Sequence, residues 1–472
     1  ELETIIFSTL NTGGTTTYEW TNDNTDIGLA ANGTGDIPSF TVTNDTTSAL
    51  IATIEVTPTY ENGGVSNTGN SETFTITVNP GAQVEAVDSQ VLCVGESTDE
   101  IVFATTNTDG TTTYEWTNDN TDIGLAANGA GDIPSFVVTG SSLVSETATI
   151  EVTPTYTNNG VTCTGNPETF TITVNPGAQV EAVDSQVLCV GESTDEIVFA
   201  TTNTDGTTTY EWTNDNTDIG LAANGTGDIP SFTVTNDTTS ALIATIEVTP
   251  TYENNGIICS GNSETFTITV NPGAQVEAVD SQVLCVGEST DEIVFATTNT
   301  DGTTTYEWTN DNTDIGLAAN GAGDIPSFVV TGSSLVSETA TIEVTPTYTN
   351  NGVTCTGNPE TFTITVNPGA QVEAVDSQVL CVGESTDEIV FATTNTDGTT
   401  TYEWTNDNTD IGLAANGTGD IPSFTVTNDT TSALIATIEV TPTYTNNGVT
   451  CTGNPETFTI TVNPGAQVEA VD

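Results

Sequence analysis

The chain has 472 residues, of which 65 are Asp or Glu and none is Lys, Arg, His or Met, so its formal net charge is -65. Without His there is no imidazole base, no His-activated nucleophile and no His ligand for a metal. Without Lys or Arg nothing neutralises phosphates, so we expect binding neither to nucleic acid nor to anionic membranes. A hydrolase built on two carboxylates stays formally possible, but no carboxylate pair stands apart from the repeated background. We therefore expect a non-catalytic protein.

The apolar fraction of 35% is patterned, which favours a folded chain over a disordered one. No apolar run reaches 18 residues, so no membrane insertion is expected. The chain begins at Glu1 without a signal peptide, and we expect a mature product or a segment of something longer. Strong acidity indicates surroundings rich in counter-ions.

An internal repeat of 96 residues organises the chain, because the run GAQVEAVD recurs at that spacing from Gly81 to Gly465. A second period of 192 residues lies above it. Repeats one, three and five carry SFTVTNDTTSALIATIEV, whereas repeats two and four carry SFVVTGSSLVSETATIEV. Near-identical copies suit length, valency or mechanical continuity better than one active site. The predicted domains are 1–80, which lacks the first sixteen positions of the repeat, then 81–176, 177–272, 273–368 and 369–464, with 465–472 as the start of a sixth.

Within 81–176, alternation and turn residues predict seven extended segments. Asp109-Gly110 predicts a two-residue hairpin between 100–106 and 111–116. Asn158-Asn159-Gly160 predicts a turn before the last strand, and 118–134 is typical of a loop. No helical period is longer than one turn. The first strand is expected in two parts, 82–87 and 90–94, and the other extended segments are 100–106, 111–116, 135–139, 147–153 and 168–174.

About seven short strands in about 95 residues, with one Trp on the third strand, predict an all-β immunoglobulin-like sandwich. We expect Tyr114, Trp116, Phe136 and Phe170 as core anchors rather than as a ligand platform. Only Asn175-Pro176-Gly177 separates one domain from the next, and a linker this short cannot behave as a free coil. A tandem, semi-rigid rod is therefore predicted.

Each full repeat carries two cysteines, 70 residues apart within a repeat and 26 apart across a junction. Residues 1–80 lack both, since Asn67 stands at the second position. Pairing across junctions would leave Cys93 and Cys451 over, so we expect pairing within repeats, in an oxidising compartment. A four-Cys zinc spacing is absent. The predicted bonds are Cys93–Cys163, Cys189–Cys259, Cys285–Cys355 and Cys381–Cys451.

A calcium site is the one cofactor hypothesis. Side-chain oxygens at Asn118, Asn120 and Asp122 alternate as in a calcium loop, and Asp132 follows. However, the glycine comes one position late and the bidentate Glu is missing. A turn capped by Asx side chains is the simpler interpretation, and diffuse screening by calcium is favoured over a dedicated site. No cofactor is required.

The strings TTTYEWTNDNTDIGLAANG, SFTVTN, ATIEVTPTY and CTGNPETFTITVNP resemble PKD-like, immunoglobulin-like repeats of giant secreted proteins of Bacteroidota, many exported by type IX secretion. The resemblance covers all five repeats. It implies a stalk of a gliding-motility-type adhesin or surface filament, with tip and anchor domains outside this segment. Thr-Asn-Asp-Asn replaces the glycine-aspartate loop of better-known PKD domains, so their ligands do not transfer.

Three functions follow as hypotheses. The first is an extracellular structural stalk, whose partners are neighbouring repeats or copies in a filament. The second is a repeated glycan- or cell-binding module acting through avidity, whose signature would be exposed aromatic residues. The third is head-to-tail assembly, in which the tail 465–472 completes the open sandwich of another copy by strand addition. We favour the stalk, with the chain ends explained by a window cut from a longer array.

Overall fold

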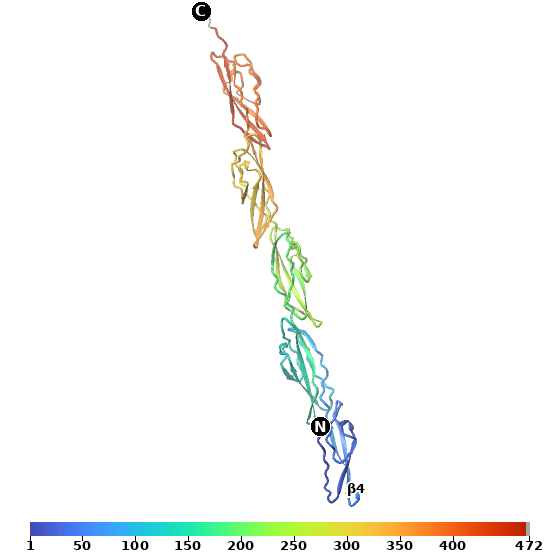
Figure 1. The fold of residues 1–472 in the computed structure, drawn as a ribbon. Coiled ribbons are helices and arrows are strands. Elements are labelled where there is room, and N and C mark those ends of the chain that lie inside the picture. Colours follow the sequence, from blue (N-terminus) through green and yellow to red (C-terminus); the bar gives the residue numbers. More distant parts are fainter. Residues whose placement is uncertain (469–472) are drawn as a thin grey trace.

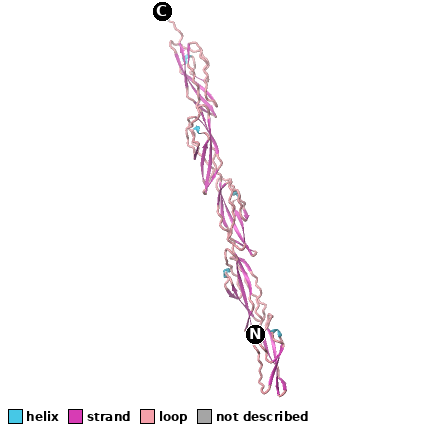
Figure 2. Cartoon of the chain, in the orientation of Figure 1, coloured by secondary structure: helices cyan, strands magenta, loops and turns pink. Residues whose placement is uncertain are grey.

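The computed structural model describes residues 1–468. These residues form five units in a nearly straight row (Figure 1), and the regular structure is almost entirely strand (Figure 2). The only helices in the described range are five single 3-10 turns, so the predicted all-β class is confirmed. None of its helices has the length and apolarity to cross a membrane. The turns are η1 (Thr25–Ile27), η2 (Thr121–Ile123), η3 (Thr217–Ile219), η4 (Thr313–Ile315) and η5 (Thr409–Ile411).

Each unit is built around one sheet, and the second shows the pattern. Its strand order is β6-β11-β9-β7-β8, and β10 pairs with the C-terminal part of β9. Neighbours are antiparallel except β6, which runs parallel to β11. The first and last strands of a unit therefore end side by side. The strands are β6 (Gln90–Cys93), β7 (Thr111–Asn118), β8 (Asn128–Ala130), β9 (Glu146–Asn158), β10 (Val161–Thr164) and β11 (Glu168–Asn175).

The other four units repeat this sheet, except that the first has no counterpart of β6. The first contains β1 (Thr15–Asn22), β2 (Asn32–Thr34), β3 (Leu50–Asn62), β4 (Val65–Thr68) and β5 (Glu72–Val78). The third contains β12 (Gln186–Cys189), β13 (Thr207–Asn214), β14 (Asn224–Thr226), β15 (Leu242–Asn254), β16 (Ile257–Ser260) and β17 (Glu264–Asn271). The fourth contains β18 (Gln282–Cys285), β19 (Thr303–Asn310), β20 (Asn320–Ala322), β21 (Glu338–Asn350), β22 (Val353–Thr356) and β23 (Glu360–Asn367). The fifth contains β24 (Gln378–Cys381), β25 (Thr399–Asn406), β26 (Asn416–Thr418), β27 (Leu434–Asn446), β28 (Val449–Thr452) and β29 (Glu456–Asn463).

The second layer of each sandwich consists of extended segments that form few backbone hydrogen bonds with one another. Two isolated antiparallel bridges join it, Ser97 to Val137 and Ile101 to Ile133. The predicted hairpin at Asp109-Gly110 is therefore wrong as a strand pair. Asp109 does turn with φ 64°, but the preceding segment belongs to the second layer while β7 pairs with β8 and β9. The turn after β9 is confirmed, because positive φ at Asn159 and Gly160 joins β9 to β10.

The core lies between the two layers, and the predicted anchors lie in it. Trp116 and Phe170 are 7% and 3% exposed, and Tyr114 and Phe136 are half-buried against the same cluster. The ring of Phe103 lies 5.3 Å from that of Tyr114 and 6.4 Å from that of Phe170. Burial of each large apolar side chain stabilises the unit by about 1.5–3 kcal/mol. The aromatic residues are therefore packing anchors, as predicted.

Trp116 also requires a glycine opposite it. In the β7–β8 pair Trp116 faces Gly129, and a Cβ at Gly129 would lie 2.2 Å from Cζ2 of the indole ring. We predict that Gly129→Ala destabilises the second unit by about 1–3 kcal/mol, because the overpacked ring has to shift. Calorimetry of the full chain should show one unit melting earlier. Gly81→Ala is the matched control, since its Cβ meets nothing within 4 Å; equal effects of the two changes would contradict the packing account.

Candidate functional site: the junction between units

The most elaborate polar structure in the chain lies where one unit meets the next. β11 ends at Asn175, which is completely buried, and Ala178, three residues later, is already buried in the following unit. The Nδ2 of Asn175 donates to the carbonyl of Asn254, at the end of β15 in that unit, over 2.9 Å. The same bond recurs at the other junctions, from Asn79 to Asn158, from Asn271 to Asn350 and from Asn367 to Asn446, at 3.1, 3.1 and 2.8 Å.

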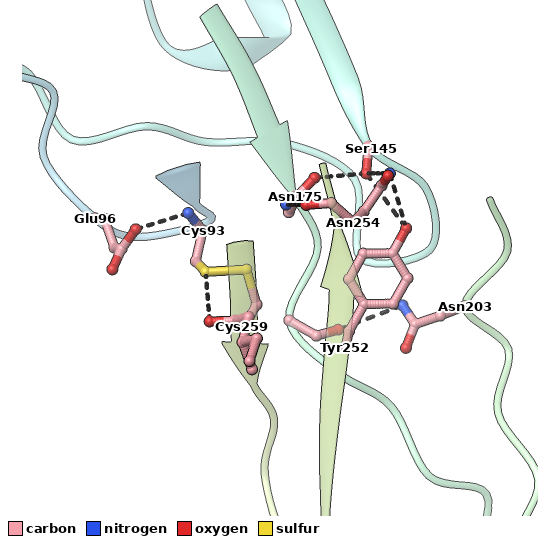
Figure 3. Close-up of a disulfide and its surroundings, with 10 residues drawn as sticks. Cys93, Glu96, Ser145, Asn175, Asn203, Tyr252, Asn254 and Cys259 are labelled. Atoms are coloured by element: carbon pink, nitrogen blue, oxygen red, sulfur yellow. Dashed lines mark hydrogen bonds between the residues drawn. A yellow bond between two sulfur atoms is a disulfide. The ribbon is translucent and has the colours of Figure 1, made fainter. Parts of the chain in front are cut away.

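Two kinds of junction alternate along the rod. Where an even unit precedes an odd one, Ser145 Oγ donates to Asn175 Oδ1 over 2.8 Å and accepts from Asn254 Nδ2 over 2.8 Å (Figure 3). Ser337 repeats this arrangement with Asn367 and Asn446. Where an odd unit comes first, alanine stands at the serine position. The Oδ1 atoms of Asn79 and Asn271 are then buried without a partner.

The loop that carries this serine or alanine also contacts the next unit through its backbone. The carbonyls of Thr47 and Thr239 accept from Thr108 and Thr300 over 2.8 and 2.9 Å, and the carbonyl of Leu143 accepts from Thr204 over 3.1 Å. These loops contain most of the positions that differ between odd and even repeats. The period of 192 residues is therefore explained by two alternating junction surfaces.

The disulfides cross the junctions. Cys93 bonds to Cys259 of the next unit, and Cys189–Cys355 and Cys285–Cys451 repeat the bond, each joining residues 166 positions apart. Cys93 ends β6 directly beside Asn175, and Cys259 lies on β16 opposite Tyr252. Both cysteines thus lie at the contact that Asn175 makes (Figure 3).

The predicted pairing within repeats is therefore wrong. β6 runs toward the following unit, whereas β10, which carries Cys163, forms the hairpin that faces the preceding unit. Cys93 and Cys163 consequently lie at opposite ends of one sandwich. The alternative across a junction, with cysteines 26 residues apart, is wrong as well. Within residues 1–468, Cys163 and Cys381 are without a disulfide partner, and they are half-buried and exposed respectively.

An acidic group takes part in an even-to-odd junction, the kind that contains the serine. Asp397 Oδ2 accepts from the backbone of Ser337 over 2.8 Å, and Oδ1 accepts from the hydroxyl of Tyr444. Desolvation pushes the pKa of Asp397 up, but these donors outweigh it and hold the pKa below its usual value. Desolvation raises the pKa of Tyr444. Because the pKa of Asp397 is lower in the folded chain than in the unfolded one, the ionised carboxylate stabilises the folded state at pH values above the unfolded pKa. This stabilisation is lost as the pH falls through the folded pKa. It is small, because Asp397 is largely solvated.

The predicted calcium ligands act as turn residues. Asn118 Oδ1 accepts from the backbone of Asn120, and Asn120 Oδ1 accepts from that of Asp122 over 3.0 Å, so Asn120 is the N-cap of η2. Asp132 Oδ1 accepts from the backbone of Phe103 over 2.9 Å. Within residues 1–468 no group of three or more Asp, Glu or Cys side chains is arranged to hold a metal ion. The first three residues share one turn, and Asp132 holds the second layer instead.

An acidic surface hollow recurs in units two to five. In the second unit its volume is about 390 Å³, and Glu85, Asp88, Asp99 and Glu100 are among its lining residues. It is open to solvent and repeats with the sequence. It adds to the diffuse negative charge of the rod.

No family model and no curated protein matches the chain. Among solved structures it is similar to Drosophila N-cadherin domains EC1-4, with 13% identity, a TM-score of 0.28 and coverage of 80% of this chain and 99% of that one. It is also similar to protocadherin gammaB7 EC3-6, with 10% identity, a TM-score of 0.33 and coverage of 81% and 100%. It is similar as well to the human desmocollin-1 ectodomain, with 12% identity, a TM-score of 0.24 and coverage of 99% of this chain and 96% of that one. TM-scores this low do not establish a shared overall structure, so the description of this chain is based on its own strands and junctions.

Non-reducing thiol labelling tests the junction bonds. For a protein of residues 1–472 we predict two labelled cysteines, Cys163 and Cys381, and a peptide that links Cys93 to Cys259 after digestion at acidic residues. Four bonds within repeats would leave no thiol to label, and that outcome would contradict the arrangement. A Cys163→Ser, Cys381→Ser double variant is the control and should label nowhere.

Proposed function

We propose that the chain is a non-catalytic, structural stalk segment of an extracellular adhesin or surface filament that attaches to cells or substrates. The observation that carries this proposal is the disulfide between successive units at three of the four junctions. Each bond, together with the buried asparagine beside it, fixes an orientation that a three-residue linker would hold only loosely. A row of units held in this way keeps the tip domain of an adhesin at a distance from the surface to which the adhesin is anchored.

The location follows from the same bonds. Disulfides form and persist in oxidising surroundings, which supports an extracellular place at the cell surface. The resemblance to PKD-like repeats supports export by a type IX route in a Bacteroidota-like cell, with the adhesion target bound by domains outside this segment. Calcium, in this proposal, screens the acidic surface diffusely. The partners are neighbouring repeats or further copies in a filament, not nucleic acid and not a membrane interior.

A glycan-binding array is the main alternative, and the aromatic residues weigh against it. Within residues 1–468 every Phe, Tyr and Trp is buried or half-buried. The exposed large apolar side chains are Ile, Leu and Val, and apart from the adjacent pairs Leu143–Val144 and Leu335–Val336 most of them are single. Sugar rings usually stack on exposed aromatic faces, and the described surface offers none. The stalk therefore explains the side chains better.

Electron microscopy of single chains tests the stalk. We predict straight rods whose junction between units one and two bends most, because that junction alone lacks a disulfide while the others have one. Reductant should broaden the other three angle distributions, and the junction between units three and four, which is of the same odd-to-even kind as the first, should then resemble it. The first junction is thus an internal control. Equal and broad angles at every junction of the oxidised protein would contradict a stalk stiffened by its disulfides.

A further inference from the structure

The three disulfides between units overlap along the chain. Cys93–Cys259 spans most of units two and three, and Cys189–Cys355 begins before that span has ended. Cys285–Cys451 overlaps the second span in the same way. Every position from 93 to 451 therefore lies inside at least one disulfide loop. A single break of the backbone within this range leaves the chain in one covalent piece.

Each bridged junction is crossed by two covalent connections, the backbone and a disulfide. Between units two and three the backbone passes through Asn175-Pro176-Gly177, and Cys93 bonds to Cys259 beside it. Cys93 lies opposite Asn175 in the parallel pair of β6 and β11, so both connections cross at one place (Figure 3). The later bonds repeat this arrangement between units three and four and between units four and five. A bridged unit is thus tied twice to its neighbour.

Inside unit three the two cysteines lie at opposite ends of the sandwich. Cys189 ends β12 beside Asn271 at the following junction, and Cys259 lies on β16 in the hairpin that faces the preceding unit. A backbone break between them, for example in the loop before β14, puts them in different halves of the unit. The half with Cys189 keeps the backbone to unit two and the disulfide to unit four. The half with Cys259 keeps the disulfide to unit two and the backbone to unit four.

Breaks in several units divide the rod into two covalent strands, and both cross every bridged junction. One strand crosses by Cys93–Cys259, then by the backbone between units three and four, then by Cys285–Cys451. The other crosses by the backbone between units two and three, then by Cys189–Cys355, then by the backbone again. Disulfide and backbone alternate along each strand. A covalent path therefore still joins unit two to unit five after one break in each unit.

Each unit presents a loop in which such a break can be made. The loop between η2 and β8 contains Ala126, which is exposed together with its neighbour Ala127. Exposed loops of small residues are preferred sites of proteolytic nicking. The absence of Lys and Arg removes the sites of trypsin-like proteases but leaves this loop open to others. The loop sequence TDIGLAANG is identical in all units, and the counterparts of Ala126 are exposed as well, namely Ala30, Ala222, Ala318 and Ala414.

A nicked sandwich without a bond to its neighbours is held together by packing alone. Its halves separate at the unfolding rate of the sandwich, which also governs its failure under force. A disulfide between units does not depend on the packing of either one. We propose that the disulfides make the rod a pair of interleaved covalent strands, which keeps carrying tension after extracellular proteases cut the backbone of its units. This inference rests on the proposed stalk function and gives the disulfides a role beyond stiffness.

Trypsin tests the two strands, because a chain without Lys or Arg is cut only where a lysine is introduced. A protein of residues 1–472 in a Cys163→Ser, Cys381→Ser background receives the changes Ala126→Lys, Ala222→Lys, Ala318→Lys and Ala414→Lys. After digestion, non-reducing denaturing electrophoresis should show two species. One should contain 1–126, 223–318 and 415–472, and the other 127–222 and 319–414. A reduced sample should show all the pieces apart and thereby reports that every site was cut.

Single cuts supply the matched control. After digestion the variant Ala222→Lys should stay near 48.8 kDa without reductant, because its cut lies inside two disulfide loops. Ala30→Lys places the same site in the same loop of unit one. In a protein of residues 1–472 it should release 1–30 without reductant, because Cys93 is the first cysteine of that sequence.

Stretching the digested four-site variant by its ends tests whether the strands carry load. The oxidised sample should hold tension, and the reduced one should part. Separate pieces without reductant, a single species that holds all pieces, as bonds within repeats would give, or an oxidised sample that parts under tension would overturn the inference. Straight uncut rods combined with any of these results would refute it and leave the stalk standing. Freely bent uncut rods would refute the stalk even where the two species appear.

Discussion

Each junction is organised by the buried asparagine that ends a unit's last strand. A buried amide without hydrogen-bond partners is costly, so Asn175 requires the hairpin of the next unit to accept from it. The parallel pairing of β6 with β11 then places Cys93 at the same contact. The disulfide and the buried amide therefore follow from one arrangement, in which the first and last strands of a unit end together against its neighbour.

This arrangement gives the sequence period of two units a physical meaning. At even-to-odd junctions the serine satisfies both sides of the amide contact, while at odd-to-even junctions alanine leaves the amide oxygens of Asn79 and Asn271 unpaired. The cost of that unpaired group is of the order of 1–3 kcal/mol. In odd units Asn44 and Asn236 instead brace the loop by donating to the carbonyls of Val78 and Val270 over 2.7 Å. The buried core positions are the same in units two to five, so most of the variation lies at the contacts.

Much of the fold within a unit could be predicted from sequence. The repeat, the all-β class, the turn at Asn159-Gly160 and the packing of Trp116 and Phe170 follow from alternation and turn residues. The second layer could not, because the pattern of 100–106 fits equally a ladder strand or extended chain lying across the sheet. A turn at Asp109 likewise does not say whether the segments it joins pair with each other.

The site was harder to predict, because it lies between units. Cysteine spacing says nothing about which end of a sandwich each thiol occupies. The direction of the strands does say so: a first strand parallel to the last one ends at the following junction, and the hairpin strand with Cys163 faces the preceding one. Asn175 carried a signal too, as a polar residue directly before the Pro-Gly of a very short linker, but the sequence alone does not distinguish it from an ordinary turn residue.

Stretching a single chain by its two ends tests the disulfides between successive units most directly. With bonds between successive units, force bypasses the bridged segments, and only 1–93, 259–285 and 451–472 can be drawn out. The oxidised chain should then extend to roughly 50 nm, and the reduced chain to roughly 160 nm, at about 3.4 Å per residue. Bonds within each unit would instead permit roughly 65 nm by the same reckoning. A maximum extension of the oxidised chain near roughly 50 nm would support disulfides between units, and one near roughly 65 nm would contradict them.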